Sequence, residues 1–476
     1  LNMSRARARQ TLWIAWLLAT AGLIAWLAHA MLNSETDKGL FMPGELTGGH
    51  HQLQLGCEAC HTDPLGGGAV LQDACISCHG EDRKKPQDSH PRTKFQDPRN
   101  ADRLEHINAL NCVTCHTEHR PEITRKNGVT QPADLCVHCH AQIGEERPSH
   151  QGMEFSTCAS AGCHNFHNNR ALYTDFLIRH LDEPELLAEP VVPEREFARI
   201  LDQTGSYPSD RYPVQPLSPG DADAPHDVSQ LGDAHADWAA TAHAQSGVNC
   251  SACHQPASAD GSRPAWSDHP HEQVCATCHG LEVERFMRGR HGMRLAADLP
   301  PVKVSEARLP MHKDAGHRSM GCNSCHVAHR YDVGHAAVEA CMDCHSDRHT
   351  LAYSDSPHYE LWQKEQRGEL PAGSGVSCAT CHMPRIEYDV SDWLTRVMVD
   401  HNQSANLSPN SGMIRSACLQ CHGLEFSIDA LADQQLIDSN FAGRPSVHVQ
   451  TMDLAAAEKE RRDSEAGDDD TSMFGF

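Results

Sequence analysis

The amino-acid sequence predicts a mainly α-helical fold with extensive irregular structure and few or no strands, divided into two domains. Three observations lead to this prediction. Aromatic residues make up only 5% of the 476 residues, which is a poor supply for conventional apolar cores. One short pattern of cysteine and histidine recurs along the chain, and a proline-rich stretch without cysteine separates two groups of it. We therefore expect short helices that carry or follow this pattern.

The recurring pattern is C-x-x-C-H, and the segment 322–349 holds two copies of it with further histidines between and after them. Ten strict copies and one copy with a four-residue loop use all 22 cysteines. In chain order, motifs 1 to 11 are Cys57–Cys60–His61, Cys75–Cys78–His79, Cys112–Cys115–His116, Cys136–Cys139–His140, Cys158–Cys163–His164, Cys250–Cys253–His254, Cys275–Cys278–His279, Cys322–Cys325–His326, Cys341–Cys344–His345, Cys378–Cys381–His382 and Cys418–Cys421–His422.

This spacing is the attachment signal for c-type haem. Two thiols one short turn apart can form thioethers with the two vinyl groups of one porphyrin, and the adjacent imidazole is then the proximal iron ligand. A zinc site would not need histidine directly after every cysteine pair, and a disulfide framework would not repeat so short a loop. The sequence therefore predicts eleven covalently attached haems and no other metal. Their large apolar surfaces would compensate for the weak apolar cores.

Histidine is abundant enough to supply a second axial ligand to every iron. Of 35 histidines, eleven are proximal by motif, which leaves 24 for eleven sixth positions. The candidate distal ligands are His50, His51, His90, His106, His119, His150, His167, His180, His243, His291, His317, His329, His335, His349, His358 and His401. With His235, His269, His271 and His312, twelve histidines of the second domain compete for six irons, so about half must have another role. His138 lies inside motif 4 and is expected at the surface.

The formal net charge is −24, and haem propionates would make the protein more acidic. This charge argues against nucleic acid as a partner and favours redox proteins with basic docking patches. Solubility alone is the alternative explanation of the charge.

The N-terminal segment 1–31 predicts export of everything that follows. Arg5, Arg7 and Arg9 precede an apolar run over 12–28, which is near the length that spans a bilayer, and basic residues on this side place the N-terminus in the cytoplasm. We expect an anchor on the periplasmic side of a bacterial cytoplasmic membrane. A cleaved signal peptide is the alternative, because Ala28-His29-Ala30 fits a cleavage site. Residues 32–48 are expected to form a stalk.

Residues 49–181 are expected to form a pentahaem domain. This part resembles the low-potential, class III-like cytochromes c with doubled C-x-x-C-H motifs, through His50-His51 ahead of Cys57, the short step from His61 to Cys75, and the wide loop of motif 5. The resemblance implies closely packed bis-histidine haems that transfer electrons.

Residues 182–233 hold eight prolines and are expected to be a linker, with one helix over the run EREFARILDQ. Residues 234–430 are expected to form a hexahaem domain. DAHADWAATAHAQ predicts an opening helix, and Ser356-Pro357 predicts the start of another over HYELWQKEQRGEL. Residues 431–476 predict a helix that frays into an acidic tail.

The second domain resembles the hydroxylamine oxidoreductase-like octahaem cytochromes. GVSCATCHMPR, the preceding HYELW with His358, the later His401 and motif 11 carry this resemblance. It implies a mainly helical haem array. The chain departs from this family in three ways, and two of them, the missing tyrosine and the missing C-x-x-C-Lys motif, weaken the case for an enzyme. The chain has six motifs here rather than eight, and it has no tyrosine after Tyr388, whereas the oxidising members cross-link such a tyrosine to the catalytic haem. It also lacks a C-x-x-C-Lys motif.

Two main functions follow. The first is an electron-transfer protein that connects a quinol-oxidising membrane module or periplasmic donor to a periplasmic or outer-membrane acceptor. The second is an enzyme that oxidises or reduces a small nitrogen or sulfur compound at one five-coordinate haem of the second domain, where distal side chains would act as acid, base and charge stabilisers. A subunit of a conducting filament is a third reading that no sequence feature favours.

Overall fold

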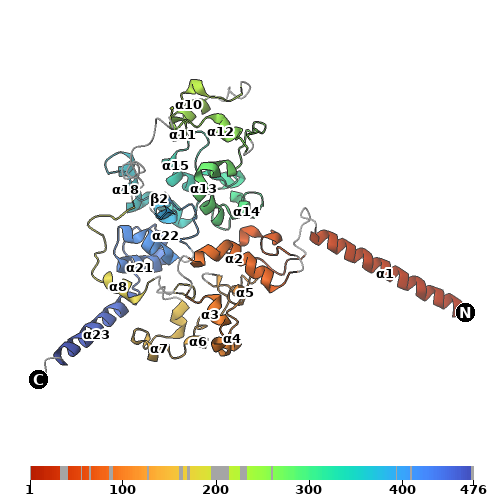
Figure 1. The fold of residues 1–476 in the computed structure, drawn as a ribbon, viewed down its shortest axis with the longest axis horizontal. Coiled ribbons are helices and arrows are strands. Elements are labelled where there is room, and N and C mark those ends of the chain that lie inside the picture. The colour runs from red at the N-terminus through yellow and green to blue at the C-terminus, as the bar shows by residue number, and fades with distance from the viewer. Residues whose placement is uncertain are drawn as a thin grey trace. The chain divides into compact units, whose positions relative to one another are not determined.

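The computed structural model describes residues 2–32, 41–54, 56–63, 66–84, 89–125, 128–159, 165–168, 172–193, 214–225, 233–258, 261–392, 394–407 and 410–472 (Figure 1). The chain divides into two compact units, one of residues 1–76 with 111–130 and one of residues 77–110 with 131–476. The helix predicted over 194–203 lies outside the described residues.

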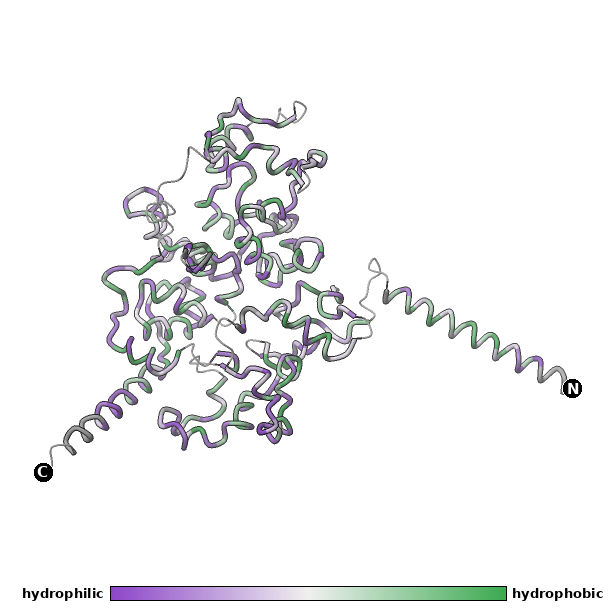
Figure 2. The backbone as a smooth tube through the Cα atoms, in the orientation of Figure 1, coloured by the Kyte–Doolittle hydropathy of each residue, from purple (hydrophilic) through white to green (hydrophobic). Residues whose placement is uncertain are grey.

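The first unit holds α1 (Asn2–Leu32), η2 (His51–Leu53), η3 (Cys57–Ala59), the first half of α2 (Gly68–Lys84) and α5 (Cys112–Cys115). Among the described residues, α1 is the one helix long and apolar enough to cross a membrane, over Arg7–Ala30. Figure 2 shows that α1 is apolar along its middle. The end of the predicted stalk packs within this unit: the amide of Thr47 donates to Glu118 Oε2 at 3.0 Å, and His119 Nδ1 lies 2.9 Å from the carbonyl oxygen of Gly44.

The second unit begins with the remainder of α2 and continues through short helices. Its elements before residue 300 are α3 (Arg92–Gln96), η4 (Pro98–Asn100), α4 (Ala101–His106), α6 (Val137–His140), α7 (Ile143–Glu146), η6 (Pro148–His150), η7 (Phe155–Ala159), α8 (Thr174–Arg179), η8 (Pro219–Asp221), α10 (Ala234–Ala239), α11 (Ala242–Gln245), α12 (Cys250–His254), α13 (Gln273–Arg288) and α14 (Met293–Ala296).

The elements after residue 300 are η9 (Val304–Glu306), η10 (Lys313–His317), η11 (Cys322–Ser324), α15 (Val333–Ala337), α16 (Glu339–Met342), α17 (Arg348–Ala352), η12 (Tyr353–Asp355), α18 (Pro357–Gln366), α19 (Cys378–His382), β1 (Arg385–Ser391), β2 (Leu394–Val399), η13 (Asn410–Gly412), α20 (Met413–Ser416), η14 (Cys418–Gln420), α21 (Leu424–Ala432), α22 (Gln434–Asp438) and α23 (Thr451–Ser472). The predicted mainly α fold with few strands is confirmed.

The only strands of the described residues form one antiparallel hairpin, β1 with β2, in which Arg385 pairs with Val399. The alternation of Ile386, Tyr388, Val397 and Val399 suits a pleated ribbon. The hairpin starts three residues after His382 of motif 10 and ends two residues before His401. It therefore returns the chain to the motifs and fixes the position of a candidate ligand.

Two local predictions can be compared with these elements. Helix α18 begins as predicted: Ser356 Oγ accepts a hydrogen bond from the amide of Tyr359, and Pro357 occupies the first turn. The single helix predicted over DAHADWAATAHAQ is wrong. Thr241 leaves the helical conformation with ψ 160° and caps a separate helix, α11, so the segment forms α10 and α11. Thr241 ends the first helix because its side chain accepts a hydrogen bond from the amide of Ala244 in the second helix.

Three apolar clusters form the described core, and all of them belong to the second unit. The largest joins α8 to the C-terminal helices, through Leu172, Phe176, Leu177, Ile414, Leu424, Ile428, Met452 and Ala455. A second surrounds Val302, Val304 and Ala315, and a third surrounds Val338, Tyr353 and Trp362. Helix α23 lies within the segment 431–476 for which a C-terminal helix is predicted, and its sequence is charged at most positions from Glu458 to Glu465.

Candidate haem-binding sites

Each described strict motif folds into one tight helical turn. The amide of the motif histidine donates to the carbonyl oxygen of the first cysteine, for example from His116 to Cys112 at 2.9 Å and from His422 to Cys418 at 2.8 Å. Residues three and four positions apart share one face of a turn. The two thiols and the imidazole of a motif therefore face the same side, which is the arrangement that a covalently bound porphyrin requires.

The described cysteines are all free thiols. Burial is the main cause that raises the pKa of Cys381 to about 11, and that of Cys325 and Cys418 to about 12 each. Among the described residues, the one cluster with the spacing of a metal site contains no cysteine. The geometry thus gives no support to a disulfide framework or to a zinc site made of C-x-x-C pairs.

Imidazole rings are arranged in a repeated pair geometry across both groups of motifs. A motif histidine faces a histidine from outside the motifs with 5.9–6.3 Å between ring centres in seven pairs: His140 with His90, His254 with His329, His279 with His243, His326 with His401, His345 with His291, His382 with His349, and His422 with His358. Every pair combines one motif and one non-motif ring.

The ring separation has a direct chemical meaning. An imidazole nitrogen binds a transition metal at about 2 Å, and the ring centre lies about 1 Å beyond the nitrogen, so two rings on opposite sides of one metal have centres about 6 Å apart. The seven pairs have this separation. The residues present therefore fit iron held between two imidazoles, above and below a porphyrin that the two thiols of the motif would hold.

Comparison with known proteins gives two family matches. The family model of cytochrome c3 matches residues 49–141, and the family model of cytochrome c552 matches residues 345–473. The first covers motifs 1 to 4 and the second covers motifs 10 and 11, together with His345. The chain is a multihaem cytochrome c. No curated protein and no solved structure matches it. The hydroxylamine oxidoreductase-like resemblance is not among these matches and stays a prediction.

The two matched segments imply that the cytochrome binds c-type haem covalently and transfers electrons. Several of its paired imidazoles are oriented by a contact at the other ring nitrogen. Nδ1 lies within 2.9 Å of a backbone carbonyl oxygen in His90 (Phe166), His254 (Ser267), His349 (Ile437), His401 (Val399) and His422 (Glu185). A proton on Nδ1 that is donated to a carbonyl leaves Nε2 as the free basic nitrogen for a metal.

Burial also keeps these rings in the state that binds iron. It is the largest cause, followed by the charge of neighbouring histidines, that lowers the pKa of His291, His326, His358 and His382 to about 4 each. A neutral imidazole is the ligand form, because protonation removes the lone pair. Polypeptide burial alone therefore favours the ligand form of these four rings at neutral pH.

The other predicted distal ligands lie in different surroundings. In the first unit, Nδ1 of His50 contacts Glu118 at 2.6 Å and Nδ1 of His51 contacts the Gly48 carbonyl at 3.0 Å, while His119 contacts Gly44 as described. In the second unit, His167 packs edge-on against Phe166, and His180 Nδ1 lies 2.5 Å from Glu183 Oε1.

Four candidate distal ligands remain: His150, His317, His335 and His106. The charge of His140 contributes to a lowered pKa at His150, although burial is the main cause. His317 is exposed at the end of η10, and His335 lies within α15. Neither faces a motif histidine at the pair distance among the described residues. The side chain of His106 lies outside the described part. His138 is exposed, as expected.

Aromatic side chains that the sequence reasoning missed support the paired imidazoles. Phe166 stacks on His90 at 4.3 Å, Trp266 on His254 at 4.8 Å and Phe426 on His422 at 4.8 Å between ring centres. Tyr331 packs edge-on against His243 at 4.7 Å. These contacts limit rotation of the rings. The sequence offered a signal for two of these aromatic residues, because Phe166 follows the histidine of motif 5 by two residues and Phe426 follows the histidine of motif 11 by four.

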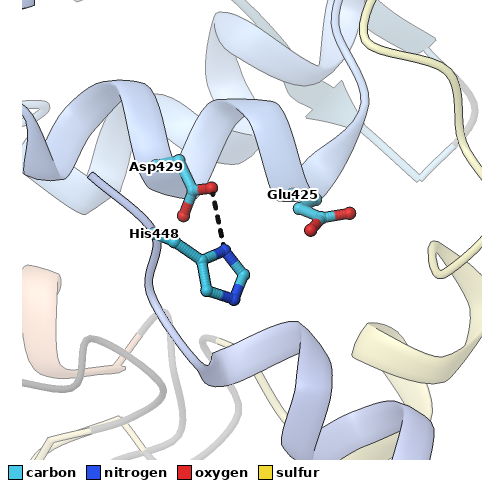
Figure 3. A group of neighbouring side chains, drawn as sticks. All are labelled: Glu425, Asp429 and His448. Atoms are coloured by element: carbon cyan, nitrogen blue, oxygen red, sulfur yellow. Dashed lines mark hydrogen bonds and ion pairs between the residues drawn. The ribbon is translucent and has the colours of Figure 1, made fainter. Parts of the chain in front are cut away.

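One acidic cluster outside the motifs is an ion-paired contact. Glu425, Asp429 and His448 lie together (Figure 3). Both ring nitrogens of His448 face carboxylates, Nδ1 toward Asp429 at 3.3 Å and Nε2 toward Asp453 at 2.8 Å, and these contacts raise the pKa of His448. A protonated His448 explains the cluster as a link between α21 and the start of α23, so no metal is needed there.

Proposed function

We propose that this cytochrome carries eleven haems and conducts electrons along them through mainly bis-histidine irons. The observation that carries the proposal is that all six motif histidines from His254 to His422 face a second imidazole at about 6 Å. Haem iron supplies one-electron redox chemistry when bound. Two imidazoles on each iron would leave no open position for a substrate, which favours electron transfer over catalysis in the predicted hexahaem domain.

The thiols of successive motifs suggest a path in sequence order. Cys275 of motif 7 contacts Cys322 of motif 8, and Cys341 of motif 9 contacts Cys378 of motif 10. In three further pairs of thiols, the two cysteines are close enough that the charge of one raises the pKa of its partner: Cys253 with Cys275, Cys325 with Cys341, and Cys381 with Cys421. Each of these contacts joins adjacent motifs, so motifs 6 to 11 would form one continuous electron path.

The cellular setting is part of the proposal. Helix α1 would hold the cytochrome at the periplasmic side of a membrane, or would act as a removed signal segment. The pentahaem domain 49–181 and the hexahaem domain 234–430 would exchange electrons with a membrane or periplasmic donor and a downstream acceptor. The net charge of −24 favours partners with basic docking patches.

Electron paramagnetic resonance of the oxidised protein tests the ligation. We expect low-spin ferric signals only, together with eleven haems per chain by pyridine haemochrome assay. A high-spin signal that responds to nitrite or hydroxylamine would contradict full ligation and would support the enzymatic alternative. His358→Ala gives a reference, because it should open one axial position at motif 11 and produce a high-spin signal. The matched variant His317→Ala should leave the spectrum unchanged.

A further inference from the structure

The segment that follows the first group of motifs is fixed onto motif 11. Residues 183–191, here called the strap, make backbone hydrogen bonds with it: Gly423 donates to Pro184 at 3.1 Å, Leu187 donates to Cys421 at 2.8 Å, and Val191 donates to Gln420 at 2.7 Å. His422 Nδ1 also faces a strap carbonyl, that of Glu185. The strap therefore holds both the cysteine turn and the imidazole of motif 11.

Helix α8, just before the strap, is held at the same place. Phe176 and Leu177 belong to the apolar cluster that contains Ile414 and Leu424 on either side of motif 11. The guanidinium of Arg415 lies 3.7 Å from the centre of the Phe176 ring. Arg462 of α23 donates to Asp175 of α8 at 2.7 Å. Figure 1 shows α8 beside α21 in the second unit.

The last motifs of the first group are tied to the same region by a short length of chain. Thr174, which begins α8, follows His164 of motif 5 by ten residues. Even fully extended, ten residues span at most about 35 Å. Motifs 4 and 5 adjoin each other, because Cys136 contacts Cys158 and His90 stacks on Phe166. By contrast, 56 residues separate Pro193 from Cys250 of motif 6 (residues 194–249).

We propose that the two groups of haems join at motif 11, with motifs 4 and 5 as its neighbours, and that motif 6 is the far end of the path. The path would therefore fold back. Motif 6 follows motif 5 in the sequence, but an electron that leaves motif 5 would pass through motifs 11 to 7 before it reaches motif 6. In the view of Figure 1, α8 and α21 lie at the left of the second unit, above α6 of motif 4 and below α12 of motif 6. This inference rests on the proposed function, because it requires haem at these motifs.

Photoreduction from two matched positions tests the junction. Because all 22 cysteines would be thioethers, one added surface cysteine gives a single labelling site. Ala257→Cys places the added cysteine three positions after His254 of motif 6, and Glu425→Cys places it three positions after His422 of motif 11. Both positions are exposed. A ruthenium-polypyridyl photoreductant on this cysteine, with a sacrificial tertiary amine, transfers one electron per flash to a nearby ferric haem. His90→Met in both proteins raises the potential of the haem at motif 4, which then serves as the acceptor to be observed.

We expect the motif 4 haem to be reduced at least about tenfold faster from position 425 than from position 257, a difference of about 1.4 kcal/mol in barrier. Equal rates, or faster arrival from position 257, would overturn the junction and leave the electron path itself intact. Absence of reduction from both positions would overturn the proposed function, and the junction with it.

Hydrogen exchange of the unlabelled holoprotein provides a second readout that does not depend on electron flow. The amides of Leu187, Val191 and Gly423 should exchange slowly, because each is donated across the strap. Rapid exchange of the peptide 183–193 would show that the strap is not held on motif 11 and would also overturn the inference.

Discussion

The motifs before residue 165 and those after residue 249 are supported differently by the polypeptide. In the later group, every motif histidine faces a second imidazole, and three apolar clusters pack around them. In the earlier group, His90 and His140 form such a pair. The described clusters contain no residue before Leu172. The comparison teaches that the later group is organised by the chain's own core, whereas the earlier group depends on its haems for packing.

The largest expected effect follows from this difference. Protein produced without haem attachment should lose the structure of residues 49–165 completely, because the described part of this range buries few apolar side chains, such as Ala74 and Phe95. Residues 300–455 should keep partial resistance to protease, because the clusters around Val304, Trp362 and Leu424 remain. Limited proteolysis with mass spectrometry of the fragments measures this. Equal digestion of both regions would contradict the comparison.

A buried ion pair sharpens the comparison within the later group. Asp400 is 7% exposed and accepts two hydrogen bonds from Arg285, at 2.8 and 2.6 Å, directly before His401. Asp400→Asn would remove the counter-charge that Asp400 gives the partly buried guanidinium of Arg285 and should lower the free energy of unfolding by about 3 kcal/mol. Chemical denaturation followed by haem absorbance measures this loss.

The matched control for this pair is an exposed one. Glu369 pairs with Arg367 at about half exposure, so Glu369→Gln should change stability far less than Asp400→Asn does. The spectrum of the haem at motif 8 should change only in Asp400→Asn, because His401 would lose its fixed neighbour. An equal effect of the two substitutions would argue against a supporting role for the buried pair.

A glycine at motif 11 tests how tightly the strap is packed. A Cβ atom at Gly423 would lie 2.5 Å from the carbonyl oxygen of Pro184 and 3.0 Å from Cβ of Glu183. Gly423→Ala should therefore destabilise the protein by about 1–3 kcal/mol through overpacking and should speed hydrogen exchange of the strap. Gly68→Ala is the control, because nothing lies within 4 Å of its added Cβ. An unchanged melting temperature in Gly423→Ala would show that the strap moves away at little cost.

The sequence could predict the motifs and the mainly α fold because both are local. C-x-x-C-H needs one turn of chain, and the cap at Ser356 needs four residues. Distal ligands are set by tertiary packing, which the sequence does not display. His329 lies three residues after motif 8 yet faces His254 of motif 6, and His291 faces His345 across 54 positions. His335, which lies between two motifs, has no such partner among the described residues, so proximity in sequence was a poor guide.

The strap was also beyond sequence reasoning. Prolines at 184, 190 and 193 predict irregular chain, and irregular chain between two groups of motifs is normally interpreted as a linker. The backbone groups of this segment instead pair with motif 11. The amides of Leu187 and Val191 find partners more than 200 residues away, and no local pattern encodes such a contact.

The smallest expected effect concerns pH and the docking of α23. Asp453 and Asp429 raise the pKa of His448, so the link between α21 and α23 is fully present below the unfolded value of about 6.5 and is lost as pH rises through the higher folded value. At the acid end, Arg461 and Arg462 lower the pKa of Glu458 to about 2, so these ion pairs within α23 are lost as pH falls from about 4.5 toward 2 and the helix itself is weakened. Helix α23 should therefore be most stable between about pH 4.5 and 6.5.

Hydrogen exchange of residues 448–460, corrected for the intrinsic pH dependence of exchange, measures this docking. Protection should decrease above neutral pH in the natural protein, whereas His448→Gln should show low protection with no such decrease. Because His448 and Asp453 are at least half exposed, the change should be small and should weaken with added salt. If the natural protein and His448→Gln had the same profile, the histidine would not be the titrating link. The start of α23 would then be held by its apolar contacts with the cluster around motif 11, through Met452 and Ala455, rather than by the charged link.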